Sequence, residues 1–180
     1  MKNTAALDSN VLTYLLDGVA DGYIPNDDTQ PIRAERVAMF QLFCYFDGSL
    51  WVSPTVREEY ARIIDLEKRL RHDRWARYLL EDVEPAASES ELRSRADKLR
   101  VTAGHSDVDD CKIVGEVEAM RIGVLLTADT GLLADLPAHT AVRILRPTQM
   151  IASLALTPGA VPIRTPPAGN PLTHQTWWRV

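Results

Sequence analysis

The sequence predicts an α/β fold in which a central parallel sheet is covered by helices on both faces. Three observations carry this prediction. Short apolar segments of strand character alternate along the chain with longer segments whose apolar residues recur at helical spacing. The length of 180 residues suits one domain. A content of 46% hydrophobic and 25% charged residues is ordinary for a globular chain and supplies a sizeable core.

The first half of the chain alternates clearly between the two kinds of segment. A short strand ends at Asp8, and proline at position 31 suits the first turn of a helix. Ser53-Pro54 is expected to open one long helix, to which Ile63, Ile64 and Leu66 supply apolar positions. The expected strands and helices of this half are residues 4–7, 11–19, 31–43, 50–52 and 54–66. The stretch 25–28 is expected to interrupt the chain after the first helix.

The second half adds two strands and a tail. An acidic joint over 84–90 leads into a charged, exposed helix, and Ser106 begins the next helix. The remaining expected elements are the strands 124–127 and 142–145 and a short helix from 147. We expect one domain over 1–156, with a charged helical segment at about 84–104, and a proline-rich tail over 157–180. The tail ends in Trp177-Trp178, which should dock on the domain or on a partner subunit, because exposed adjacent tryptophans promote aggregation.

Composition excludes several classes of function. A net charge of −5 and a pI near 5.4 argue against a protein that grips nucleic acid by charge alone. Cys44 and Cys111 lack the spacing of a metal or redox motif and read as buried thiols. No apolar run reaches the roughly 18 residues of a membrane span, and the first ten residues have no secretory character. These features predict a cytoplasmic protein without a membrane role.

Acidic residues follow the predicted strands at positions where α/β proteins bind ligands. Asp8 and Asp129 each come directly after a strand, and ligands bind beyond the carboxyl ends of parallel strands. Asp110 falls on the inward face of its helix, whereas Asp109 is expected to point to solvent with Lys112 and Glu116. Carboxylates brought together need protons or a cation. Hard oxygen ligands favour Mg²⁺ or Mn²⁺, ions that can activate water for phosphodiester hydrolysis.

Four motifs in order resemble those of the PIN-domain family. The segments are Leu7-Asp8-Ser9-Asn10, the strand and helix start from Val52 to Glu59, Asp110-Cys111-Lys112-Ile113, and Leu125-Leu126-Thr127-Ala128-Asp129. A closing Arg146-Pro147-Thr148 is also similar to the family's last strand and helix, so the resemblance covers roughly residues 4–154. The motif spacing selects Glu59 over Glu58.

The resemblance implies a three-layer α/β/α sandwich and divalent-metal-dependent endoribonuclease activity. It assigns Asp8, Asp110 and Asp129 to holding Mg²⁺ or Mn²⁺, with Glu59 completing the site or positioning water. Many small bacterial members are VapC-type toxins, which are neutralised by an antitoxin protein and commonly form homodimers. An antitoxin and a second copy are therefore expected partners beside the RNA substrate. The chain is longer than those members, through the segment at 84–104 and the tail.

Each of these residues could have a purely structural role instead of the assigned functional one. Asp8 could cap the helix that follows it, and Asp129 could be a turn residue. Ser9, Asn10 and Thr127 either orient the carboxylates or serve as caps and turn formers. Asp107 reads as a helix-start residue and as a reserve ligand. The basic residues are either a solvated face or a guide for RNA: Arg57, Arg62, Lys68, Arg69, Arg71, Arg74 and Arg77.

Two other functions remain in competition with the nuclease. One is a catalytically inactive PIN-like domain that acts as a protein-interaction module. The other is a phosphotransfer domain on a similar sheet, which would need a second aspartate where Asn10 stands.

Overall fold

A computed structural model describes residues 3–22, 29–80, 87–166 and 168–180. In chain order the elements are β1 (Thr4–Leu7), α1 (Ser9–Asp21), α2 (Gln30–Tyr45), β2 (Ser49–Val52), α3 (Pro54–Ala61), α4 (Leu66–Leu79), α5 (Glu89–Ala103), α6 (Val108–Ala119), β3 (Val124–Leu126), α7 (Thr130–Asp135), η1 (Pro137–His139), β4 (Arg143–Leu145), α8 (Pro147–Ser153) and η2 (Pro171–His174). The expected break at 25–28 and residues 84–86 of the expected joint lie outside the described residues.

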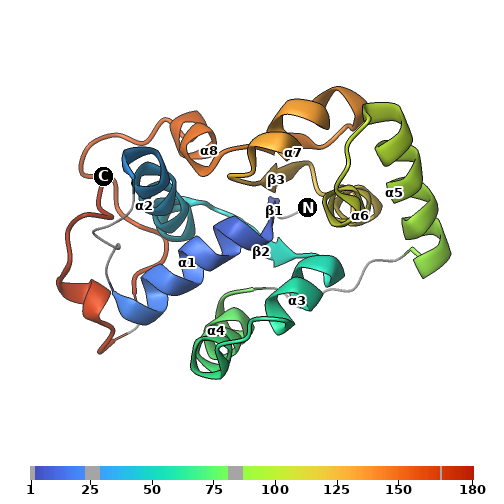
Figure 1. Cartoon of the computed structure of the whole chain (residues 1–180). Helices are drawn as coiled ribbons and strands as arrows, with labels where there is room; N and C mark the ends of the chain where they lie inside the picture. The colour runs from blue at the N-terminus through green and yellow to red at the C-terminus, as the bar shows by residue number, and fades with distance from the viewer. Residues whose placement is uncertain (1–2, 23–28, 81–86, 167) are drawn as a thin grey trace.

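The strands form one parallel sheet in the order β2-β1-β3-β4. The last residue of β1, Leu7, pairs with Val52 and Leu126, and Leu126 pairs with Leu145. All four strands therefore end at the same edge of the sheet. Helices α1 and α2 lie on one side of the strands and α5 and α6 on the other (Figure 1). The prediction of an α/β fold with a parallel sheet flanked by helices is confirmed.

Apolar residues of the strands and the helices make one core. Residues 5–7 of β1 are buried, as are Leu15 and Leu16 of α1 and Ile113 and Val114 of α6. Strands that are covered on both faces have continuous apolar sequences. The strands could be located in the sequence because of these apolar runs. Among the residues that the structure describes, no helix is long and apolar enough to cross a membrane.

The long helix expected from residue 54 is two helices instead. Helix α3 ends at Ala61, and the side chain of Asp65 accepts a hydrogen bond from the Lys68 amide at 2.9 Å to cap α4. Ile64, expected to pack inward, is fully exposed at 100%. The guanidinium of Arg69 donates to the Ala61 carbonyl at 3.2 Å and so closes the turn between the helices. The prediction was wrong because the aspartate cap outweighs the apolar periodicity.

Helix α5 is largely exposed, as expected, and its two buried residues, Ala96 and Leu99, pack it along α6. One further expectation on the second half needs correction. Helix α6 starts later than expected, because the side chain of Asp107, not Ser106, accepts the amides of Asp109 and Asp110. The capping reading of Asp107 is thereby confirmed.

Buried glutamates cap the first turns of two helices. Glu116 of α6, expected to face solvent, is buried and accepts the amide and hydroxyl of Thr55 in α3 at 3.2 and 2.8 Å. Glu35 of α2 makes the same pair of contacts with Thr148 in α8, at 3.0 and 2.8 Å. The first amides of a helix lack partners within it and carry partial positive charge, so an anion from a neighbouring element stabilises them. Glu116 thereby fixes the start of the helix that carries Glu59.

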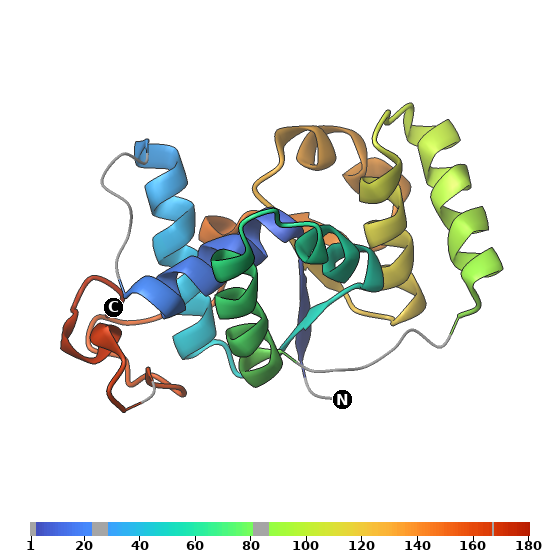
Figure 2. The same ribbon diagram turned by 60° about the horizontal axis from the view of Figure 1, so that its bottom comes forward.

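The tail packs against α1 and α2 at one end of the molecule, whereas α5 lies at the other (Figure 2). Trp178 is only 3% exposed, and its indole donates to the Leu172 carbonyl at 3.1 Å. The guanidinium of Arg164 donates to the carbonyls that end α2, including that of Phe46 at 2.7 Å. Gly22 ends α1 at φ 72°, and a side chain there would collide with Pro171. Of the two docking surfaces expected for Trp177 and Trp178, the domain or a partner subunit, the structure shows the domain.

Candidate functional site

Asp8 lies at the centre of the site, at the end of β1, and is 3% exposed. Its Oδ1 accepts the Ser9 amide at 2.6 Å, and its Oδ2 accepts the Asn10 amide group at 2.9 Å and the Thr127 hydroxyl at 2.6 Å. The same carboxylate caps α1, so the capping role is real. Asn10 supports the site from its other end, because its oxygen accepts the Ala128 amide at 3.0 Å.

Asp129 follows β3, the neighbouring strand of the sheet. Its Oδ1 accepts the amides of Gly131 and Leu132 at 2.7 and 2.9 Å, which caps α7. The hydroxyl of Thr127 accepts the Asp129 amide at 2.9 Å while it donates to Asp8. One threonine therefore joins the two strand-end aspartates. Asp129 itself is exposed to solvent, in contrast to Asp8.

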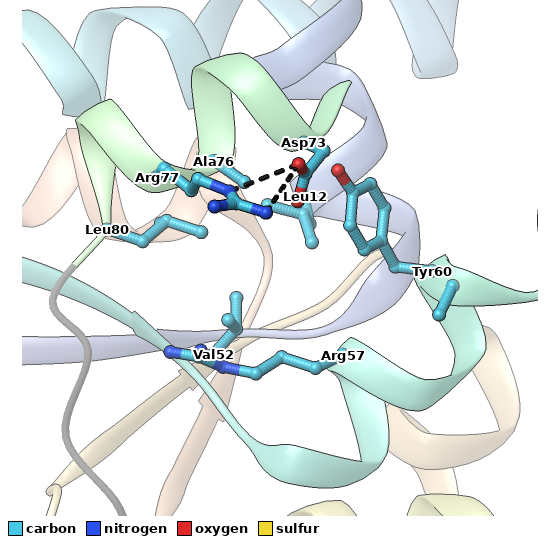
Figure 3. A pocket seen from close by; sticks show the side chains of 9 residues that line it. Leu12, Val52, Arg57, Tyr60, Asp73, Ala76, Arg77 and Leu80 are labelled. Carbon is cyan, nitrogen blue, oxygen red and sulfur yellow. Dashed lines mark hydrogen bonds and ion pairs between the residues drawn. The ribbon is translucent and has the colours of Figure 1, made fainter. Parts of the chain in front are cut away.

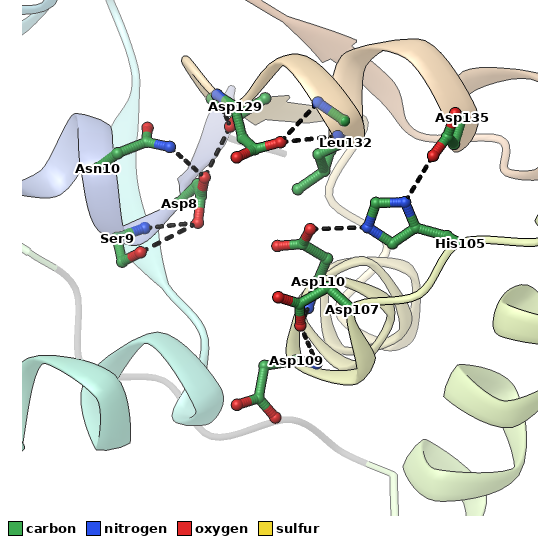
Figure 4. A network of polar contacts seen from close by, with 12 residues as sticks. Asp8, Ser9, Asn10, His105, Asp107, Asp109, Asp110, Asp129, Leu132 and Asp135 are labelled. Atoms are coloured by element: carbon green, nitrogen blue, oxygen red, sulfur yellow. Dashed lines mark hydrogen bonds and ion pairs between the residues drawn. The ribbon is translucent and has the colours of Figure 1, made fainter.

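Asp110 reaches the site from the first turn of α6. Its Oδ2 lies 2.7 Å from Nε2 of His105, and Nδ1 of the same ring lies 2.8 Å from Asp135. The imidazole is 6% exposed and is held between two carboxylates (Figure 4). The His105 ring therefore links Asp110 in the first turn of α6 to Asp135 at the end of α7. The sequence analysis did not identify His105, because a histidine five positions before an aspartate has no recognisable motif spacing.

Glu59 lies beside this group on α3 and is half-buried, whereas Glu58 is exposed. Ser9, whose amide donates to Asp8, also lowers the pKa of the nearby Glu59 carboxylate, against the rise that burial causes. Ser9, Asn10 and Glu59 line a small hollow of about 250 Å³ together with Leu12 and Tyr60. The hollow leads from the carboxylates along α1 and α3.

The carboxylates interact electrostatically across the site. Burial raises the pKa of Asp8, and the charge of Asp129 adds to this, against the hydrogen bonds from Thr127 and Ser9. Burial also raises the pKa of Glu59, opposed by the Ser9 hydrogen bond and reinforced by Asp8 and Asp110. The pKa of Asp110 rises to about 6, chiefly through burial, although the hydrogen bond from His105 opposes the rise. The charged forms of Asp8, Glu59 and Asp110 are therefore disfavoured, and a bound cation would stabilise them.

The donor set suits a hard divalent cation in type and charge. Carboxylate oxygens are the ligands that Mg²⁺ and Mn²⁺ prefer. Figure 4 shows Asp8, Asp110 and Asp129, from three different elements, facing a common space. Within the described parts of the chain, no three acidic, histidine or cysteine side chains stand close enough to hold one ion. A bound ion would therefore have to draw the carboxylates together.

The reserve ligand and several of the basic residues have structural partners. Asp107 is exposed, and one of its oxygens caps α6. Arg62 pairs with Glu58 at 3.6 Å and Arg77 with Asp73 at 2.9 Å, as expected for a solvated face. Lys68 reaches Asp17 of α1 at 3.5 Å instead.

Comparison with known proteins finds similarity in structure alone. The sequence matches no protein-family model, and it matches no curated protein significantly. A chain in the crystal structure of VapBC2 from Rickettsia felis, bound to a DNA fragment from their promoter, has a TM-score of 0.51 and 13% identity over 79% of this chain and 97% of that chain. A chain in the crystal structure of FitAcB from Neisseria gonorrhoeae has a TM-score of 0.49 and 14% identity, with the same coverage of 79% and 97%. At these identities the likeness concerns the fold.

Proposed function

We propose that this chain is a divalent-metal-dependent endoribonuclease of the PIN type, which hydrolyses phosphodiester bonds of RNA. The observation that carries the proposal is the meeting of Asp8, Asp110 and Asp129 at the carboxyl edge of a parallel sheet, with Glu59 beside them. Asp8 and Asp129 follow β1 and β3, and Asp110 lies in α6, so the three come from distant parts of the chain. Burial disfavours the charged forms of Asp8, Glu59 and Asp110, and a cation bound among the carboxylates would compensate for this.

In this proposal Asp8, Asp110 and Asp129 would hold Mg²⁺ or Mn²⁺. When bound, the ion supplies an acidic water for attack on phosphorus and stabilises charge on the leaving oxygen. Thr127 and Asn10 fix the orientation of the Asp8 oxygens, and His105 does so for Asp110. Glu59, half-buried at the hollow beside Asp8, completes the metal site or orients the water. Asp107 stays in reserve as a ligand.

We further propose that the protein is the toxin of a cytoplasmic toxin–antitoxin pair. Two observations support this role: the order and spacing of the PIN-like motifs, and the fold likeness to a chain of VapBC2. An antitoxin protein and a second copy of the chain are the partners that follow from it. The DNA in the VapBC2 crystal is a ligand of that complex.

One observation favours a second candidate, a catalytically inactive PIN-like module that binds another protein. The described carboxylates do not converge closely enough to hold an ion as they stand. Both oxygens of Asp8 also have hydrogen-bond donors, so this residue is satisfied without a cation. Metal affinity therefore distinguishes the two candidates.

The test is cleavage of labelled total RNA by the purified chain with Mg²⁺ or Mn²⁺, against the same reaction in EDTA. Asp129→Asn and Glu59→Gln should lose the metal-dependent cuts. Glu58→Gln is the matched control, because Glu58 neighbours Glu59 but points to solvent, and it should cut like the wild type. In parallel, Mn²⁺ should raise the melting temperature of the wild type and not that of Asp129→Asn. Absence of both cleavage and thermal shift would support the interaction module.

A further inference from the structure

A second cavity opens beside the carboxylate site, between α3, α4 and α1 (Figure 3). Its volume is about 480 Å³, in the range of about 300–1,000 Å³ typical of small-molecule sites. Nothing in the proposed chemistry at the carboxylates uses it. The cavity exists because α3 and α4 are separate helices, so that α4 turns back over α1.

One face of α4 forms the outer wall of this cavity. Asp73, Ala76, Arg77 and Leu80 recur at the spacing of one helical face. Leu12 and Val52, both buried, close the apolar floor, and the ring of Tyr60 stands at one side. The walls thus combine apolar surface, an aromatic ring and charged groups.

The polar groups of the cavity present both acceptors and donors. The carboxylate of Asp73 is held by Arg77 through contacts of 2.9 and 3.1 Å, both to Oδ2. A carboxylate accepts about four hydrogen bonds, so this ion pair leaves acceptor capacity on Asp73. The guanidinium of Arg57 extends into the cavity from α3 (Figure 3).

The cavity adjoins the smaller hollow that contains Glu59. Leu12 and Tyr60 line it and also line the smaller hollow that contains Ser9, Asn10 and Glu59. An RNA strand with a phosphate at the carboxylates would pass over Leu12 and Tyr60 to place a neighbouring base in the cavity. Bases of single-stranded RNA are bound by aromatic and guanidinium planes and by hydrogen bonds to their edges.

We propose that this cavity binds one unpaired nucleobase of the RNA substrate, a base with an exocyclic amino group, and so selects where the strand is cut. The apolar floor and Tyr60 receive the flat faces of the base. Asp73 accepts from the amino group, as carboxylates do from the amino groups of bases. The arginines complement the negative charge of the backbone. This inference rests on the proposed ribonuclease function.

The first test measures binding without catalysis. The purified chain in EDTA is titrated with AMP, CMP, GMP and UMP, and binding is followed by calorimetry and by NMR shifts of Ala76 and Leu80. The amino-bearing nucleotides should bind at least about 5-fold more tightly than UMP, a difference of about 1 kcal/mol. Asp73→Asn should reduce that discrimination, because an amide also donates.

The second test fills the cavity. Ala76→Phe should weaken nucleotide binding at least about 10-fold and alter the pattern of metal-dependent cuts in RNA. Ala76→Met is a smaller filler for use if the phenylalanine prevents folding. Ala152→Phe, at an exposed alanine of α8, is the matched control and should behave like the wild type. Melting temperatures of the variants confirm that they are folded.

The outcomes separate this inference from the proposed function. Metal-dependent cleavage whose sites and efficiency are unchanged by Ala76→Phe would overturn the base-binding cavity and leave the nuclease in place. Nucleotide binding lost in Ala76→Phe, in a chain without metal-dependent cleavage, would retain the cavity as a nucleotide site and remove the nuclease. Binding of synthetic amphipathic peptides in place of nucleotides would assign the cavity to a protein partner and overturn the inference.

Discussion

At the scale of single residues, the Thr127 hydroxyl determines how the two strand-end aspartates stand relative to each other. It donates to Asp8 at 2.6 Å and accepts from the Asp129 amide at 2.9 Å, so both hydrogen-bonding capacities are used inside the site. Thr127 is fully buried, and water cannot replace these contacts without rearrangement. The proposed function therefore depends on a residue that would touch neither ion nor RNA.

Thr127→Val keeps the shape of the side chain and removes both contacts. We expect metal affinity and cleavage rate to fall about 10–100-fold, the usual effect of removing a group that orients a metal ligand. Thr127→Ser, which keeps the hydroxyl, should retain most of the activity. Mn²⁺ titration monitored by melting temperature, alongside cleavage assays, checks both variants. Equal activity of valine and serine variants would show that the hydroxyl has no part in the site.

Asp110 gives the metal-free protein a specific pH dependence. Its pKa is raised from 3.8 to about 6 by burial and by neighbouring acids, against the hydrogen bond from His105. The folded state therefore binds this proton more tightly than the unfolded state does. The contribution of this proton on Asp110 to the free energy of unfolding is complete below about pH 4 and is lost as the pH rises through about 6.

Asp110→Asn should accordingly be more stable than the wild type at pH 7 in EDTA, by about 1–3 kcal/mol, and no more stable at pH 4. The asparagine oxygen can still accept from His105. Asp8→Asn should not gain stability, because the Asp8 oxygens accept from Ser9 and Thr127 and an amide group would face a donor. Urea unfolding at the two pH values measures the effect. Equal stability of Asp110→Asn and the wild type at pH 7 would contradict the raised pKa.

At the scale of elements, the buried glutamates allow a matched comparison. Glu116→Ala removes the acceptor for Thr55 in the first turn of α3, which carries Glu59, whereas Glu35→Ala removes the equivalent acceptor for Thr148 in α8, away from the carboxylates. Each should destabilise the fold by about 1–3 kcal/mol, since buried donors lose their acceptor. Only Glu116→Ala should also reduce cleavage at temperatures where both variants are folded. An equal loss of activity in both would mean that the effect is one of stability alone.

The elements that were predicted correctly are those that local sequence patterns determine. Apolar runs and helix-start chemistry located the strands and most helices, and the parallel order explained why Asp8 and Asp129 meet. The division between α3 and α4 was missed, because Asp65 caps a helix inside an apolar pattern that continues past it. The roles of Glu116 and His105 were also missed, since each depends on a partner from another element. The cavity beside α4 could not be predicted without that division.

At the scale of the whole molecule, the tail is part of the packed structure. Trp178 and Leu172 are buried against α1 and α2, and Phe40 lies 5.4 Å from the Trp177 ring and 6.1 Å from that of Trp178. Asn170 donates to the Val19 carbonyl at 2.8 Å. Residues 157–180 therefore cover apolar surface that 1–156 alone would expose to water.

Trp178→Ala should lower the free energy of unfolding by about 3–5 kcal/mol, the usual cost of truncating a buried aromatic residue. Trp177→Ala is the comparison, and its effect should be smaller because that ring is only half-buried. Chemical denaturation followed by circular dichroism measures both. Metal-dependent cleavage should remain in any variant that is folded, because the tail lies away from the carboxylates. A negligible effect of Trp178→Ala would contradict the docking of the tail.

The contacts of Thr127 also bear on which ion the protein would select. Asp8 and Asp129 are joined through one side chain, so their separation is fixed by neighbouring strands. Asp110 belongs to α6 and is held by His105 instead. Cations of different ionic radius would therefore be accommodated by displacement of α6 and not by spreading of the sheet. We expect the position of α6, which carries Asp110, to determine the preference between small ions such as Mg²⁺ and larger ones such as Ca²⁺.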